Sequence, residues 1–145
     1  MIVDRNLQQK EIKEALKAGQ QAIDHLERAR KDLKSASGFG FADMLGLDII
    51  GGMGKHMKMN NAANQLNMAK TAVKNFQREL NDVQGHLNFQ IDIGSFLTFA
   101  DFLFDGLLAD YLVQSKINNT INQVDIALSH IRPIVADLYR MEQEL

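Results

Sequence analysis

The sequence predicts an all-α protein, an antiparallel bundle of three long helices with a glycine-rich helical connection and an internal duplication. Hydrophobic residues recur at alternating steps of four and three, which is typical of long helices that pack side by side. The 145-residue chain has one proline and few β-branched runs bounded by turn signals, so strands are not expected. Two segments of 40 residues also match each other at a constant offset.

The first helix is expected to begin at Asp4, which can cap it, and to end at about Ser37. Its inward positions, which we call its seam, are Ile12, Leu16, Gly19, Ile23, Leu26, Arg30 and Leu33. Gly19 has no side chain, so it permits close approach of a neighbouring helix. Two glycines in the segment 37–40 suit the left-handed conformation of helix ends, so this segment is expected to end the helix.

A second helical region is expected from about Phe41 to about Gly85, with a bend or break near Gly51–Gly54 in the glycine-rich segment 46–54. Each glycine costs roughly 1 kcal/mol relative to alanine inside a helix. The seam beyond it is Ala62, Leu66, Ala69, Val73, Phe76, Leu80 and Val83. Methionines are expected to fill the core, although they would also suit a peptide-binding groove. They are Met44, Met53, Met57, Met59 and Met68.

The third helix is expected to start near Ser95 and to continue, with a kink, through Pro133. Most positions of its seam are apolar, but Asp110 and Gln114 are polar. The seam is Leu103, Leu107, Asp110, Gln114, Ile117, Ile121, Val124, Leu128, Ile131, Val135 and Leu138.

The internal duplication relates residues 41–80 to residues 99–138 without a gap. Eleven of the 40 positions are identical, and amphipathicity alone does not require identical asparagines at fixed spacing. The matches include Phe41, Ala42 and Asp43 with Phe99, Ala100 and Asp101, and Asn60 and Asn61 with Asn118 and Asn119. Both segments are therefore expected to lead into a long helix.

Composition bounds the class of protein. The length fits one domain, residues 1–145. The net charge of −2 argues against general nucleic-acid binding, which needs a basic field. There is no cysteine and no recognisable signal peptide, so a cytoplasmic location is expected. The most apolar stretch, Ser95 to Val113, contains three aspartates, which disfavours a membrane span.

Several segments in and around the predicted duplication together resemble a set of small helical bacterial proteins of uncharacterised function. They are Phe41-Ala42-Asp43, Gly51-Gly52, Lys55-His56, Asn61-Ala62, Asp101-Phe102, Phe104-Asp105-Gly106, Asp110 and Lys116-Ile117. The resemblance covers about residues 37–125 and implies a bacterial source. It brings no activity and no catalytic residues.

Two polar groups are candidate sites. Carboxylates and a histidine that converge could bind magnesium, manganese or iron, or they could instead cap helices and pair with cationic side chains. This candidate metal set is Asp43, His56, Asp101, Asp105 and Asp110. A second polar set could bind a ligand, or its amides could link helices. It consists of Lys55, Asn60, Asn61, Asn118 and Asn119.

A basic cluster lies near the end of the first helix and is interpreted as a solvated face rather than a binding patch. It consists of Arg28, Arg30, Lys31 and Lys34. Lys55 and His56 are the expected counter-charges for any buried aspartate among Asp101, Asp105 and Asp110, and Arg30, in the seam, is the reserve candidate. No complete catalytic or cofactor motif is present in the sequence, and no cofactor is expected.

The sequence favours a non-enzymatic helical interaction or scaffold protein that self-associates through its heptad seams or binds a helical protein partner. One alternative is a membrane-surface protein, in which the apolar segments Phe39–Met53 and Phe96–Val113 insert shallowly. Another is a divalent-metal-dependent protein or enzyme that uses the Asp/His set.

Overall fold

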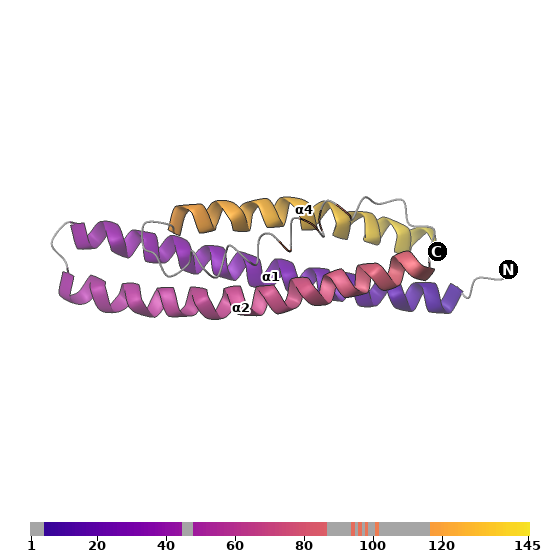
Figure 1. Cartoon of the computed structure of the whole chain (residues 1–145), viewed down its shortest axis with the longest axis horizontal. Helices are drawn as coiled ribbons and strands as arrows, with labels where there is room; N and C mark the ends of the chain where they lie inside the picture. The colour runs from indigo at the N-terminus through magenta and orange to yellow at the C-terminus, as the bar shows by residue number, and fades with distance from the viewer. Residues whose placement is uncertain are drawn as a thin grey trace.

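The computed structural model describes residues 5–44, 48–86, 94, 96, 98, 101 and 117–145, with side chains at 5–35, 61–84, 94, 96, 98, 101 and 118–145. These residues form three long helices and no strand, which confirms the all-α class. The helices are α1 (Arg5–Met44), α2 (Asp48–His86) and α4 (Ile117–Glu144). α1 packs against both α2 and α4 (Figure 1). No helix in these ranges is both long and apolar enough to cross a membrane.

The predicted seams form the core. Every predicted seam position of α2 from Ala62 to Val83 is buried, as are the α4 positions from Ile121 to Leu138. In α1 the seam is buried except at Ile23 and Arg30, which are half-buried. Four alanines widen the buried face of α1 beyond two positions in seven, and they are Ala15, Ala18, Ala22 and Ala29. Fully burying a leucine or isoleucine contributes about 1.5–3 kcal/mol, so these seams hold the helices together.

Three predictions about helix boundaries and continuity are wrong. Residues 41–44, with which the second helix was expected to begin, belong to the end of α1. α1 does not end at Ser37 but continues through two glycines to Met44. α2 runs as one helix from Asp48 to His86, so the predicted break near Gly51–Gly54 is wrong, whereas a bend there stays a prediction. Glycine permits the left-handed conformation without requiring it, and its helix propensity is a weak preference that the surrounding structure can override.

One residue before α4, Phe96, also belongs to the core. Gly94, Phe96, Thr98 and Asp101 have helical backbone, and the ring of Phe96 is buried 5.7 Å from that of Phe76, at an interplanar angle of 56°. This tilted arrangement is favourable for aromatic pairs. The predicted helix start at Ser95 lies outside the described residues, as do the seam residues 103, 107, 110 and 114. In α4 itself, the exposed Pro133 does not end the helix.

Candidate functional site

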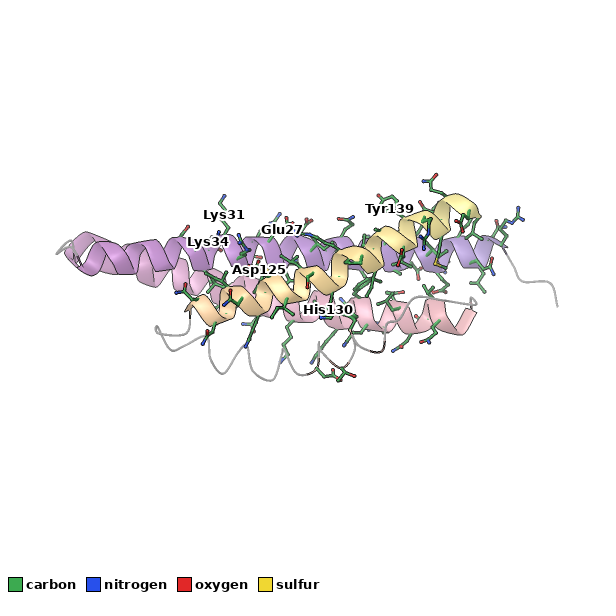
Figure 2. The ribbon with its side chains drawn as sticks, turned by 90° about the horizontal axis from the view of Figure 1, so that it is seen from above. Glu27, Lys31, Lys34, Asp125, His130 and Tyr139 are labelled. Carbon is green, nitrogen blue, oxygen red and sulfur yellow. The ribbon has the colours of Figure 1, made fainter. Side chains whose placement is uncertain are left out.

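A groove of about 710 Å³ lies between α1 and α4, and we call it the basic groove. It is lined by Glu27, Arg30, Lys31, Lys34 and Ser35 of α1 and by Asp125, Leu128, Ser129 and Arg132 of α4. Four cationic side chains and two carboxylates give this lining a net charge of +2, although the whole chain carries −2. Figure 2 shows Glu27, Lys31 and Lys34 on α1 beside Asp125 on α4.

Two ion pairs cross the basic groove from α1 to α4. Nε of Arg30 donates to Oδ1 of Asp125 at 2.5 Å, where the two side chains are 36% and 43% exposed. Nη2 of Arg132 donates to Oε1 of Glu27 at 2.6 Å. Partly exposed pairs of this kind contribute at most about 1 kcal/mol to stability. Their main effect is to hold both guanidinium groups in place and to neutralise them.

The two lysines of the basic groove are not neutralised by any side chain that the structure describes. Neither Lys31 nor Lys34 forms an ion pair with any side chain in the described part of the protein, and both are exposed. They are three residues apart on α1, which places them on the same face of the helix. The uncompensated charge of the groove is therefore concentrated on two neighbouring ammonium groups.

A second groove, of about 360 Å³, lies between α1 and α2, and we call it the amide groove. Its lining is Gln21, His25, Asn67, Met68, Thr71, Ala72 and Asn75, with no lysine, arginine, aspartate or glutamate. Met68 is 51% exposed, so its prediction as a core residue is wrong. It lies on the outer face of α2, between the buried Leu66 and Ala69. The other predicted core methionines have side chains outside the described set.

His25 links the two helices beside the amide groove. Its Nδ1 lies 3.1 Å from Oε1 of Gln65, so the ring donates in the tautomer that carries its proton on Nδ1. The sequence had singled out Asn61, Asn118 and Asn119 for such links, but all three side chains are exposed and lie outside the seams. The interhelical amide contact is therefore made by Gln65, at the edge of the seam.

A cluster of three glutamates lies elsewhere on α1 and α2. Carboxylate oxygens of Glu11, Glu14 and Glu79 lie within 4.8 Å of one another. Oε2 of Glu11 and Oε2 of Glu79 are buried and have no hydrogen-bond partner among the described residues. Burial raises the pKa of Glu79, and the negative charges of Glu14, Asp82 and Glu11 raise it further, against the opposing effect of Arg78. The cluster therefore brings three carboxylates together, and no described cationic side chain pairs with the buried oxygens of Glu11 and Glu79.

The predicted metal set lies mostly outside the described side chains. Asp101 is exposed, so it needs no buried counter-charge, and Arg30 pairs with Asp125 instead. Asp43 lies in α1 and His56 in α2, but their side chains are outside the described set, and so are Asp105 and Asp110. The same holds for the side chains of Lys55 and Asn60 in α2.

The sequence interpretation missed the α4 half of the basic groove. Asp125, Ser129 and Arg132 are spaced by four and three residues, so they share one face of α4 beside the seam. The α1 residues of the groove, from Glu27 to Lys34, have comparable spacing. The polar faces beside the seams of α1 and α4 are visible in the sequence as a pattern. That these two faces lie opposite each other is not visible in the sequence.

Comparison with known proteins adds no assignment. A scan against protein-family models, a search of curated proteins and a search of solved structures each found no match. The resemblance in the sequence likewise brought no activity. The function is therefore argued from the two grooves and from the charges around them.

Proposed function

We propose that this chain is a non-enzymatic, cytoplasmic helical interaction protein that associates with a second copy of itself through the amide groove. The observation that carries this proposal is the exposed Met68, an apolar residue in a groove without lysine, arginine, aspartate or glutamate. Depletion of charged residues and enrichment of methionine are typical of the centres of protein interfaces. A groove between two helices also suits the ridge of side chains on a third helix.

The chemistry of the amide groove favours a second copy over an unrelated partner. Gln21, Asn67 and Asn75 each carry both a hydrogen-bond donor and an acceptor. A patch of this kind is complementary to itself across a two-fold axis, whereas a patch of one charge repels its copy. The seams are already buried within one chain, so we assign self-association to this outer groove and not to the seams.

We also propose that the bundle is antiparallel, with α1 running opposite to α2 and α4. The contacts between α1 and α2 support this direction. Gly19 of α1 lies against Phe76 of α2, whereas His25, which comes later in α1, contacts Gln65, which comes earlier in α2. The contacts of α1 with α4 follow the same order, with Glu27 at Arg132 and Arg30 at Asp125. The colour gradient along the three helices in Figure 1 agrees with this direction.

Burial supports the proposed duplication of 41–80 as 99–138. Positions that are separated by 58 residues are buried in both α2 and α4, as expected if the two helices are copies of one unit. These pairs are Ala62 and Thr120, Leu66 and Val124, Ala69 and Ala127, Val73 and Ile131, Phe76 and Ile134, and Leu80 and Leu138.

Light scattering coupled to size exclusion tests the proposed self-association. We expect a mass about twice the 16.3 kDa of one chain, which falls toward one chain on dilution. Met68→Glu should shift the equilibrium to the monomer, because it places a charge at the centre of the interface. Ile126→Glu is the matched control, since Ile126 is 45% exposed but lies on α4, outside the amide groove.

The proposal is overturned if the wild-type protein is monomeric at all concentrations. It is also overturned if the Met68→Glu and Ile126→Glu variants have the same mass as each other in solution. A mass that only Ile126→Glu reduces would move the interface to α4. Circular dichroism of both variants checks that a change in mass does not come from loss of helix.

A further inference from the structure

We propose that the basic groove binds a small ligand that carries two or more linked phosphate groups. This inference goes beyond the proposed self-association, because it concerns a different surface, between α1 and α4. The groove combines two ammonium groups that have no ion-pair partner among the described residues with two guanidinium groups held in ion pairs and with a hydroxyl group at Ser35. The two lysines are exposed and take no part in the hydrophobic core.

The charges of the groove select an anion. Arg30 and Arg132 are held by Asp125 and Glu27, so they are already partnered. Lys31 and Lys34 carry the uncompensated charge, and an ammonium group has three donors and acts as a compact point charge. Bringing two positive charges together on one helix face is unfavourable unless an anion lies between or above them. A ligand that is itself multiply charged satisfies both lysines at once.

The spacing of the lysines favours linked phosphates. Residues three apart on a helix have Cβ atoms about 5–6 Å apart, and long lysine side chains can converge from that separation on adjacent phosphate groups. Charge-assisted hydrogen bonds to phosphate are stronger than those between neutral groups. Ser35, one residue beyond Lys34, adds a hydroxyl donor to the same lining. The hydroxyl of Ser129 already donates to the carbonyl of Ile126, at 2.6 Å, so it offers a phosphate no free donor.

The dimensions of the groove favour a small ligand over a polymer. A volume of about 710 Å³ lies within the range of small-molecule sites, roughly 300–1,000 Å³. Nucleic acid would require a more extended basic field than this net-acidic chain provides. Linked phosphates occur both in soluble metabolite-sized molecules and, as phosphorylated headgroups, in lipids, and the chemistry that the groove recognises is the same.

Isothermal titration of the full chain with inorganic pyrophosphate and with tripolyphosphate tests the proposal. We expect binding that weakens as salt is added, because the charges are exposed to screening. Lys31→Ala/Lys34→Ala should weaken binding by about tenfold or more, given the loss of two charge-assisted contacts. Lys10→Ala/Lys13→Ala is the matched control: these lysines are also exposed, also three apart and also on α1, but outside the groove. It should leave the affinity nearly unchanged.

A variant with the opposite expected effect gives an independent test. Asp125→Asn removes a negative charge from the lining and frees the guanidinium of Arg30, so it should strengthen pyrophosphate binding.

Flotation with phosphatidylcholine vesicles, with and without a phosphorylated phosphatidylinositol, distinguishes the two sources of the phosphate. If the wild-type protein binds the phosphorylated vesicles and Lys31→Ala/Lys34→Ala does not, the ligand is a lipid headgroup. If the protein binds only soluble polyphosphate, the ligand is a free molecule.

The proposal fails if neither pyrophosphate nor the phosphorylated vesicles bind. It also fails if Lys31→Ala/Lys34→Ala and Lys10→Ala/Lys13→Ala bind pyrophosphate equally well. Finally, it fails if polyglutamate binds as tightly as tripolyphosphate, since the groove would then show no preference for phosphate. These outcomes are independent of the mass measurements on Met68→Glu, so either proposal can fail without the other.

Discussion

Gly19 of α1 lies so close to Phe76 of α2 that a Cβ atom at position 19 would stand 3.0 Å from Cε1 of the ring. Cγ2 of Val135 on α4 would be closer still, at 2.7 Å from the same Cβ. The absent side chain therefore lets α1 approach both neighbouring helices at one level of the bundle. This confirms the expectation that Gly19 permits close approach.

We expect Gly19→Ala to destabilise the protein. Alanine gains about 1 kcal/mol in helix propensity, but the added methyl group must displace a valine methyl and an aromatic ring edge in a packed core. Overpacking of this kind costs about 1–3 kcal/mol, so the net loss should be up to about 2 kcal/mol in urea unfolding. Val135→Ala should offset part of the loss in a double-mutant cycle. Additive effects of the two substitutions would contradict the close approach.

Glu79→Gln should stabilise the protein at neutral pH. The pKa of Glu79 is raised by burial and by neighbouring carboxylates, so the folded state holds its proton more tightly than the unfolded chain does. The wild-type protein therefore loses stability relative to the variant as the pH rises from the ordinary value of 4.5 through the raised pKa. At pH 7 the gain should be about 0.5–1 kcal/mol, because glutamine avoids the cost of burying a charge and removes the like-charge contacts.

The pH dependence provides the check. Thermal melts of the Glu79→Gln variant and the wild type should converge below the ordinary pKa of 4.5, where Glu79 is protonated in both the folded and the unfolded state. Asp24→Asn is the control, because Asp24 is exposed on α1 and is not part of the glutamate cluster. A melting temperature of Glu79→Gln that is below the wild-type value at pH 7 would mean that the charge of Glu79 is stabilising.

Pro133→Ala should also stabilise the protein. Pro133 is exposed inside α4, so the substitution creates no cavity, and it restores a backbone N–H to the helix. Proline inside a helix costs about 3 kcal/mol relative to alanine, although a backbone that is already adapted to proline reduces the gain on replacement. We expect about 1–2 kcal/mol in chemical denaturation. Asn122→Ala, at another exposed position of α4, should gain less than 1 kcal/mol.

Leu66→Asp tests the seam. Leu66 is 2% exposed, so an aspartate there places a carboxylate in the core. Loss of the buried leucine alone costs about 2–5 kcal/mol, and the buried charge adds to this. We expect a lower melting temperature by about 10 °C or more, or no folded protein. Asn64→Asp, exposed and two residues away, is the control and should melt close to the wild type. If both variants melt together, the seam of α2 is assigned incorrectly.

The amino-acid pattern was sufficient to predict the helices and their buried faces. Residues such as Ile12, Leu66 and Leu138 occupy positions that recur with the period of packed helices, and all three are buried. Burial of a helix face follows from local periodicity, because any neighbour that excludes water will bury the same side. The prediction was poorer at glycines 38 and 40, where local propensity competes with the continuation of a long packed helix.

The tertiary structure alone decided which side chains meet. The pairing of Arg30 with Asp125, 95 positions later, depends on α4 lying beside α1 at one particular level. The same is true of the exposure of Met68, which is apolar by composition but faces outward because α2 turns Leu66 and Ala69 toward the core. Contacts between distant segments are set by the sum of many packing interactions across the helices, so no local pattern contains them. Both grooves arise from that packing, and with them the two surfaces to which we assign binding.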